Sequence, residues 1–254
     1  MEGNSCVVFC NCGASVIPEE KARQLADGLK GLESDVVELN DLCAFSVHEK
    51  DFLSTLGGKY RRKIIIACYP RAVKNMLRQG SVEPGDYEVL NFRELSAGEI
   101  LNALQNDFQI TQGVAVYLAV KSSLEVPAWF PVIDQSRCTL CGKCARFCLF
   151  GVYRFDKKSL DVVNPLACKN NCPACGRTCP SSAIIFPRLT VNSVLAGAEP
   201  EEAGNTVPNE ISFVMLHQRN RDRKNIFRSG LLRQAEEERT RALEEIKQIK
   251  TNRE

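Results

Sequence analysis

Residues 138–148 read CTLCGKCARFC and residues 168–180 read CKNNCPACGRTCP, so eight cysteines lie within a short part of the chain. The first run has the spacing CxxCxxCxxxC and the second has the spacing CxxxCxxCxxxCP. An apolar segment of the kind that forms a short strand follows each run, GVYRF after the first and AIIF after the second. The runs are offset by 30 residues, from Cys138 to Cys168. This pseudo-repeat predicts two halves that are related by a pseudo-twofold axis.

The spacing of the cysteines has a chemical reason. A 4Fe-4S cubane presents four irons, and three cysteines spaced two residues apart can ligate three of them from one loop. The fourth iron then needs a cysteine from elsewhere in the chain. Zinc is the alternative, because paired CxxC elements bind it too, but zinc sites do not require this triple spacing twice or the closing Cys179 and Pro180. The cysteines therefore predict iron-sulfur clusters.

Residues of about 131–187 resemble the bacterial two-cluster ferredoxins, which implies an α+β domain with two 4Fe-4S clusters. In that family the fourth cysteine of each run ligates the cluster of the other run. Carried over by position, the first cluster takes Cys138, Cys141, Cys144 and Cys179, and the second takes Cys168, Cys172, Cys175 and Cys148. Two departures are visible: Leu149 stands where the family usually has proline, and CKNNC is one residue longer than usual. The longer gap is expected to change the amide hydrogen bonds to the second cluster and hence its potential.

The composition predicts a soluble globular protein in the cytoplasm. The chain has 254 residues, 44% hydrophobic and 25% charged, with a net charge of +2, which favours two domains and gives no global attraction to nucleic acid or membrane. No apolar run approaches the roughly 18 residues of a membrane span, and the opening MEGNSCVVFC does not have the pattern of a signal peptide. Thirteen cysteines are then better explained as metal thiolates than as a disulfide framework.

Residues 1–120 predict an α/β domain with a parallel sheet. Short β-branched runs such as SCVVFC, DVVEL and KIIIACYP alternate with helix-like segments, and one helix begins near Ser96 with a capping box that includes Glu99. Residues 121–131 have two prolines and no clear period, so they predict a linker.

Five further cysteines lie in this first domain. Four of them follow predicted strands, at Cys10, Cys12, Cys43 and Cys68. Ligands bind at the carboxyl edge of a doubly wound sheet, so these four are expected near one edge. Cys6 is interpreted as a core residue.

Residues of about 5–80 resemble the amino-terminal part of the A subunit of heterodisulfide reductase, through VVFCNCG, NDLCAF and IIIACYPRAVKNML. The resemblance implies that Cys10, Cys12, Cys43 and Cys68 bind a third 4Fe-4S cluster. The alternative is that they are partly buried strand-end thiols. That subunit also has a flavin domain with a GxGxxG fingerprint, which this sequence lacks, so no flavin is expected on this chain.

The remainder of the chain predicts a linker at 188–228 and a final helix at 229–251. The segment HQRNRDRKNIFR ahead of that helix is strongly basic, and the helix has only a thin apolar stripe, so partner docking and a solvated helix both stay open. His48 and His217 have no metal partner at helical spacing and are expected at the surface.

The function predicted from these features is electron transfer. The chain is interpreted as a subunit that relays single electrons between redox proteins, such as flavoproteins or other iron-sulfur proteins, in a hetero-oligomeric complex that is heterodisulfide-reductase-like or flavin-based. No catalytic residue is assigned. The rival is a redox enzyme whose amino-terminal cluster reduces a disulfide-type substrate. A third alternative is a regulatory sensor with labile clusters. The sequence argues against it because it has no recognisable DNA-binding helix.

Overall fold

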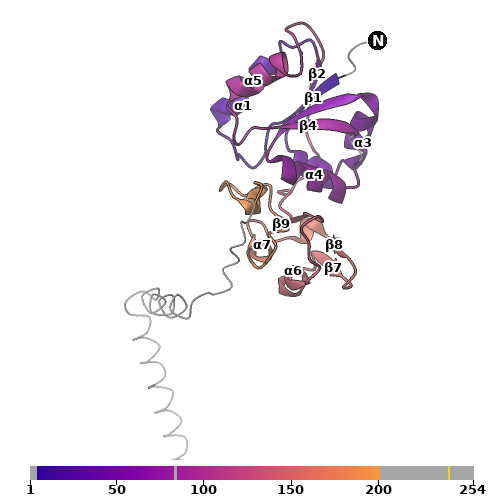
Figure 1. Ribbon diagram of the computed structural model, residues 1–254, viewed down its shortest axis with the longest axis vertical. Coiled ribbons are helices and arrows are strands. Elements are labelled where there is room, and N and C mark those ends of the chain that lie inside the picture. The colour runs from indigo at the N-terminus through magenta and orange to yellow at the C-terminus, as the bar shows by residue number, and fades with distance from the viewer. Residues whose placement is uncertain (1–4, 83–84, 201–239, 241–254) are drawn as a thin grey trace, which may run out of the picture. The chain divides into compact units, whose positions relative to one another are not determined.

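The computed structural model describes residues 5–82, residues 85–200 and Thr240. The chain divides into two compact units, residues 1–200 and residues 201–254. The first unit contains the sheet and both cysteine runs (Figure 1). The helix predicted at 229–251 lies outside the described residues, apart from Thr240, and so does the predicted linker beyond residue 200.

The first part of this unit is a parallel sheet of five strands, which confirms the predicted α/β class. The strand order is β4-β3-β1-β2-β5, and every neighbouring pair is parallel. Beyond their first residues the central strands β1 and β3 are apolar, because both of their faces are covered. The strands are β1 (Ser5–Cys10), β2 (Asp35–Leu39), β3 (Arg62–Ala67), β4 (Asp86–Asn91) and β5 (Tyr117–Val120).

Helices cover both faces of the sheet. Helices α1 (Glu19–Leu29) and α5 (Ala97–Asn106) lie side by side on one face (Figure 1). Helices α2 (Leu42–Val47), α3 (Lys50–Lys59) and α4 (Pro70–Gln79) belong to the other, as right-handed crossovers require. The predicted capping box is confirmed at α5, where the Ser96 side chain accepts from the Glu99 amide and the Glu99 side chain accepts from the Ser96 amide.

The ferredoxin-like part, residues 131–187, is built from two similar halves. In the first half, β6 (Val132–Ile133) leads through α6 (Lys143–Phe147) to β7 (Tyr153–Phe155). In the second, β8 (Leu160–Val162) leads through α7 (Ala174–Arg177) to β9 (Ile184–Ile185). β6 pairs with β9 and β7 pairs with β8, both antiparallel, so each half contributes one strand to each small sheet. This exchange of strands is the arrangement that the pseudo-repeat predicts.

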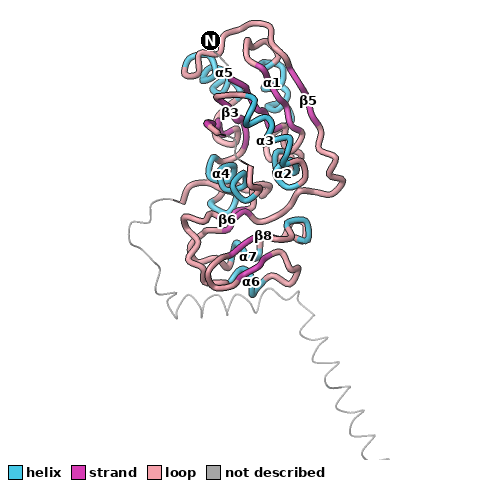
Figure 2. Tube along the Cα trace, turned by 90° about the vertical axis from the view of Figure 1, so that its right-hand side faces the viewer, coloured by secondary structure: helices cyan, strands magenta, loops and turns pink. Residues whose placement is uncertain are grey.

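Helix α4 joins the sheet to the ferredoxin-like part, and it lies against β6 (Figure 2). The Arg71 side chain is 3% exposed, and its Nε donates to Asp134 Oδ2 at 2.6 Å. Its other nitrogens donate to the carbonyls of Ser182 and Val194. Gln79 adds a second link, because its Nε2 donates to the Pro131 carbonyl just before β6 and its Oε1 accepts from the Ile133 amide in β6.

Residues 188–200, which the sequence analysis placed in a linker, lie in the first unit and include the short 3-10 helix η2 (Val194–Ala196). Gly197 has φ +116°, and a Cβ there would come within 2.6 Å of the Ala72 side chain on α4. The segment therefore packs tightly on the sheet domain. Among the described residues, no helix is long and apolar enough to cross a membrane.

Candidate iron-sulfur centres

The strand order brings the four cysteines of the first domain to one place. The chain runs from β1 to β2 on one side and then returns to place β3 on the other side of β1. Cys10 ends β1, and Cys12 follows in the loop. Cys43 lies in the first turn of α2, just after β2, and Cys68 directly follows β3. This reversal point at the carboxyl edge is where ligands bind in open α/β sheets.

Electrostatic effects between the thiols show how close they lie. The hydrogen bond with Cys12, and then burial, raise the pKa of Cys10 well above its ordinary value. The same hydrogen bond lowers the pKa of Cys12 to about 7. Burial, followed by the charges of Asp41, Cys68 and Cys12, raises the pKa of Cys43 well above its ordinary value. Burial, followed by the charge of Cys12, raises the pKa of Cys68 to about 12. Four neighbouring thiols, three of them buried, suit a metal centre, because a cation compensates the cost of burying thiolates.

Two arginines lie beside these thiols. Arg188 forms an ion pair with the buried Asp41, and its charge opposes the rise in the pKa of Cys43. The charge of Arg93 likewise opposes the rise in the pKa of Cys68. The Nε atom of Arg93 is buried, and it has no hydrogen-bond acceptor among the described residues. An anionic cluster would supply both the negative charge and the missing acceptor, so this donor set fits a 4Fe-4S group.

Cysteines of the two runs in the ferredoxin-like part lie near one another. Burial, together with the charges of Cys175, Cys179 and Cys138, raises the pKa of Cys144 to about 12. Burial likewise raises the pKa of Cys168 to about 12, with further contributions from Cys175, Cys148 and Cys172. Cys179 thus approaches the first run and Cys148 approaches the second. The exchange of Cys148 and Cys179 between the two clusters stays a prediction.

Left-handed backbone positions let the cysteine loops curl. Leu140 and Gly142 have φ values of +53° and +67° in the first run, and Asn171 has φ +59° in the second. Asn171 lies in the longer CKNNC gap, and asparagine tolerates this conformation better than most residues. A Cβ at Gly142 would come within 2.3 Å of the Phe155 ring, so glycine is required there for space as well as for its φ.

Donors to the cysteine sulfurs come from outside the runs. The amide of Ala183 donates to Cys179 Sγ at 3.3 Å, and the Tyr153 hydroxyl donates to Cys175 Sγ at 3.1 Å. Burial, followed by the charge of Cys175, raises the pKa of Tyr153, which keeps its proton available for that bond. Hydrogen bonds to the sulfurs tune the potential of a cluster. The sequence reasoning missed Tyr153, and its place in an apolar strand segment gave no signal of this role.

All thirteen cysteines are free thiols. Within residues 5–82 and 85–200, no three His, Cys, Asp or Glu side chains converge as the ligands of one metal ion would. The thiolates of a cubane stand at four separate corners, so they need no such convergence.

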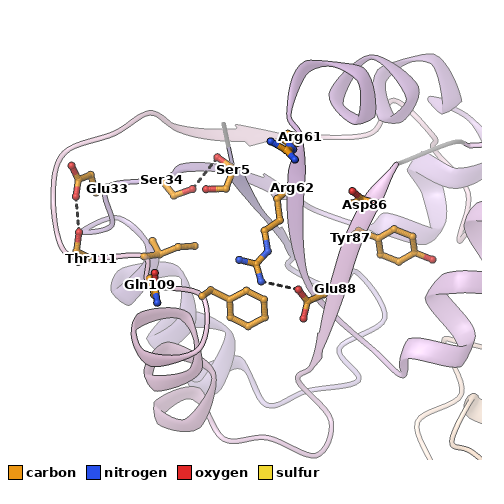
Figure 3. Close-up of a pocket in the computed structure, with 12 residues that line it drawn as sticks. Ser5, Glu33, Ser34, Arg61, Arg62, Asp86, Tyr87, Glu88, Gln109 and Thr111 are labelled. Carbon is orange, nitrogen blue, oxygen red and sulfur yellow. Dashed lines mark hydrogen bonds and ion pairs between the residues drawn. The ribbon is translucent and has the colours of Figure 1, made fainter. Parts of the chain in front are cut away.

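A cavity of about 990 Å³ lies at the opposite, amino-terminal edge of the sheet (Figure 3). It is polar and contains the ion pair of Arg62 with Glu88 and the hydrogen bond from Thr111 to Glu33. None of the residues that line it is a cysteine. This cavity therefore contributes no cysteine ligand to the candidate centres.

Comparison with known proteins agrees with this geometry. The family described as "4Fe-4S binding domain" matches residues 130–153. An uncharacterised ferredoxin of Methanocaldococcus jannaschii is 44% identical over 61 residues, which are 24% of this chain and 42% of that protein. The chain thus matches about two fifths of the length of this curated relative, and no solved structure matches the chain. The likeness to heterodisulfide reductase stays a prediction. The chain contains a ferredoxin-type, 4Fe-4S-binding domain, whose chemistry is electron transfer.

Proposed function

We propose that this chain is an electron-transfer subunit that relays single electrons through three 4Fe-4S clusters. The observation that carries the proposal is the gathering of its cysteines: eight in the ferredoxin-like part and four at the carboxyl edge of the sheet, within one compact unit. The buried Arg71–Asp134 ion pair holds these two parts together. Each cluster supplies a site that gains and loses one electron.

The proposed ligand sets are those that the resemblances to two-cluster ferredoxins and to heterodisulfide reductase imply by position. Two clusters exchange their fourth ligands, so that each bridges both halves of the domain. Cluster one is held by Cys138, Cys141, Cys144 and Cys179, cluster two by Cys168, Cys172, Cys175 and Cys148, and cluster three by Cys10, Cys12, Cys43 and Cys68. The protein's residues bury these ligands, donate hydrogen bonds to them and balance the charge of the clusters.

Cluster two is the one that faces the sheet domain. Cys168 packs against both the core of the sheet domain and the core of the ferredoxin-like part. Trp129 donates from Nε1 to the Cys172 carbonyl at 3.4 Å, and its ring stacks on Phe186 with centroids 5.3 Å apart. Two residues beyond Phe186, Arg188 pairs with Asp41 beside the third set of thiols. This continuous packing supports an electron route between clusters two and three.

The proposed partners are flavoproteins or other iron-sulfur proteins of a heterodisulfide-reductase-like or flavin-based complex. The proposed location is the reducing cytoplasm, where cysteines persist as metal ligands and not as disulfides. Because no residue is assigned a catalytic role, substrate chemistry belongs to the partner.

The test is the iron and acid-labile sulfide content of anaerobically purified protein, with EPR spectra of the reduced sample. Three cubanes predict about twelve irons per chain. About eight irons would leave a ferredoxin fused to a cluster-free α/β domain and would remove cluster three. Fewer than four, with no reduced 4Fe-4S signal, would contradict electron transfer by this chain altogether.

A further inference from the structure

Large apolar side chains are exposed on one side of the ferredoxin-like part. They come from the loop around Cys148 and from the segment that precedes Cys168. Their exposed fractions are 52% for Phe147, 90% for Leu149, 44% for Phe150, 40% for Val163 and 44% for Leu166. Single exposed apolar residues are normal, but five in two short segments are a patch, which marks a binding surface.

The two segments lie side by side. Asn164 donates from Nδ2 to the Gly151 carbonyl at 2.9 Å, and the Val163 amide donates to the Val152 carbonyl at 2.9 Å. Cys148 and Cys168, which flank the patch, are themselves neighbours. The patch, which we call the Cys148 face, therefore covers ligands of proposed cluster two.

The exposed side-chain charge around the Cys148 face is positive. All eight Lys and Arg residues of 131–187 are exposed, including Arg146 next to Phe147 and Lys169 next to Cys168. Of the three acidic residues in this range, Asp134 is buried against Arg71 and Asp161 pairs with Arg154. An apolar centre with a charged rim is the usual anatomy of a protein interface.

We propose that the Cys148 face docks an acidic redox protein, whose apolar centre covers Leu149 and whose carboxylates approach Arg146 and Lys169. The inference rests on the proposed function, because the docked partner exchanges one electron with cluster two. A second copy of this chain would bring two positive rims together. Residues 201–254 contain 11 Lys and Arg against 10 Asp and Glu, so they do not supply the acidic charge either.

The experiment uses the full chain with its clusters loaded and reduced, and an acidic flavodoxin as the probe. One electron leaves a reduced cluster, and one electron with one proton from solvent enters the flavin of the probe. Leu149→Gln is expected to lower the second-order rate constant in stopped flow by about tenfold, as loss of a central anchor does. Val114→Gln is the matched control, because Val114 is 98% exposed on the sheet domain, and it is expected to leave the rate unchanged.

The charge of the rim is tested with Lys169→Glu against Lys50→Glu, an exposed lysine of α3. Lys169→Glu is expected to slow the reaction severalfold at about 0.01 M ionic strength. The difference is expected to shrink at about 0.1 M, where the Debye length falls from about 30 Å to about 10 Å. Lys50→Glu is expected to have a much smaller effect.

Iron content, EPR spectra and the potential of cluster two are measured first for every variant. Protein that lacks the reduced cluster signals would sink the proposed function itself. With clusters intact and potentials unchanged, an unaltered rate for Leu149→Gln, or a wild-type rate that rises with salt, overturns the docking inference. The docking inference is also overturned if the wild-type protein sediments as a dimer and Leu149→Gln sediments as a monomer. The Cys148 face would then bind a second copy of this chain.

Discussion

Arg71 is the single residue on which the junction of the two parts depends most. Its guanidinium is enclosed, and it bonds Asp134 together with carbonyls from two further segments. Burial raises the pKa of the Asp134 carboxyl, but bonds from Ser136 and Arg71 outweigh this effect and lower it below its ordinary value. A carboxyl with a lowered pKa stabilises the fold above its unfolded pKa and loses that contribution as acid protonates it.

Arg71→Met is expected to reduce the free energy of unfolding by about 3–5 kcal/mol, because it leaves the Asp134 charge buried without a partner. Anaerobic denaturant unfolding measures the change. Arg23→Met is the control, because its ion pair with Glu20 is exposed and is worth at most about 1 kcal/mol. Adding Asp134→Asn to Arg71→Met should recover part of the loss, and a purely additive double variant would contradict the pairing.

Arg93 is expected to act on the proposed cluster three. Arg93→Met is expected to lower the reduction potential of this cluster, because the positive charge and the Nε donor both favour the more negative reduced state. Arg93→Lys keeps the charge but loses Nε, so a smaller shift is expected. Redox titration followed by EPR gives both values. Equal reduction potentials in the wild type and both variants would show that Arg93 does not act on the cluster. Its role would then be limited to its hydrogen bonds with Asn192 and Leu189.

At the scale of elements, the turn into α6 shapes the first cysteine loop. Gly142 is the N-cap residue of α6, with a left-handed backbone and the Phe155 ring directly against it. Gly151 has nearly the same φ, +65°, but nothing lies within 4 Å of its added Cβ. The two glycines therefore separate the effect of backbone strain from the effect of a steric clash.

Gly142→Ala is expected to reduce iron loading and to weaken the EPR signal of cluster one, because the loop must move to accommodate the methyl group. Gly151→Ala is expected to retain full iron content and to lose only about 1–2 kcal/mol of stability from its left-handed backbone. Iron analysis and thermal unfolding compare the two variants. Equal loading in both would show that the contact with Phe155 is not needed for the loop.

At the scale of the whole molecule, the third set of thiols depends on strands that are distant in sequence. Cys43→Ala is expected to cost about four irons per chain while the ferredoxin signals persist, because the other clusters take no ligand from the sheet domain. Iron analysis with EPR measures both quantities. Cys6→Ala is the matched control, since Cys6 is 0% exposed but lies at the start of β1, away from the carboxyl edge. An unchanged iron count for Cys43→Ala would show that these thiols are core residues and do not bind a cluster.

The class of the fold and the iron-sulfur chemistry of the ferredoxin-like part can be predicted from local patterns in the sequence. Runs such as KIIIACYP predict buried parallel strands because strands covered on both faces must be apolar throughout, and the Ser96 capping box is visible because its contacts are local. The cysteine spacing predicts iron-sulfur chemistry for the same reason, since one short loop supplies three ligands. The family that matches residues 130–153 agrees with that prediction.

The surroundings of these cysteines can be seen only in the folded chain. Arg93 and Arg188 lie beside the thiols of the sheet edge although they are distant from them in sequence. Arg71 pairs with Asp134, which is 63 residues away in the chain. Tyr153 and the exposed Leu149 have no sequence pattern that marks a sulfur donor or a docking face. These contacts follow from strand order and from packing between segments far apart in the chain, and such long-range choices leave no periodic signal in a single sequence.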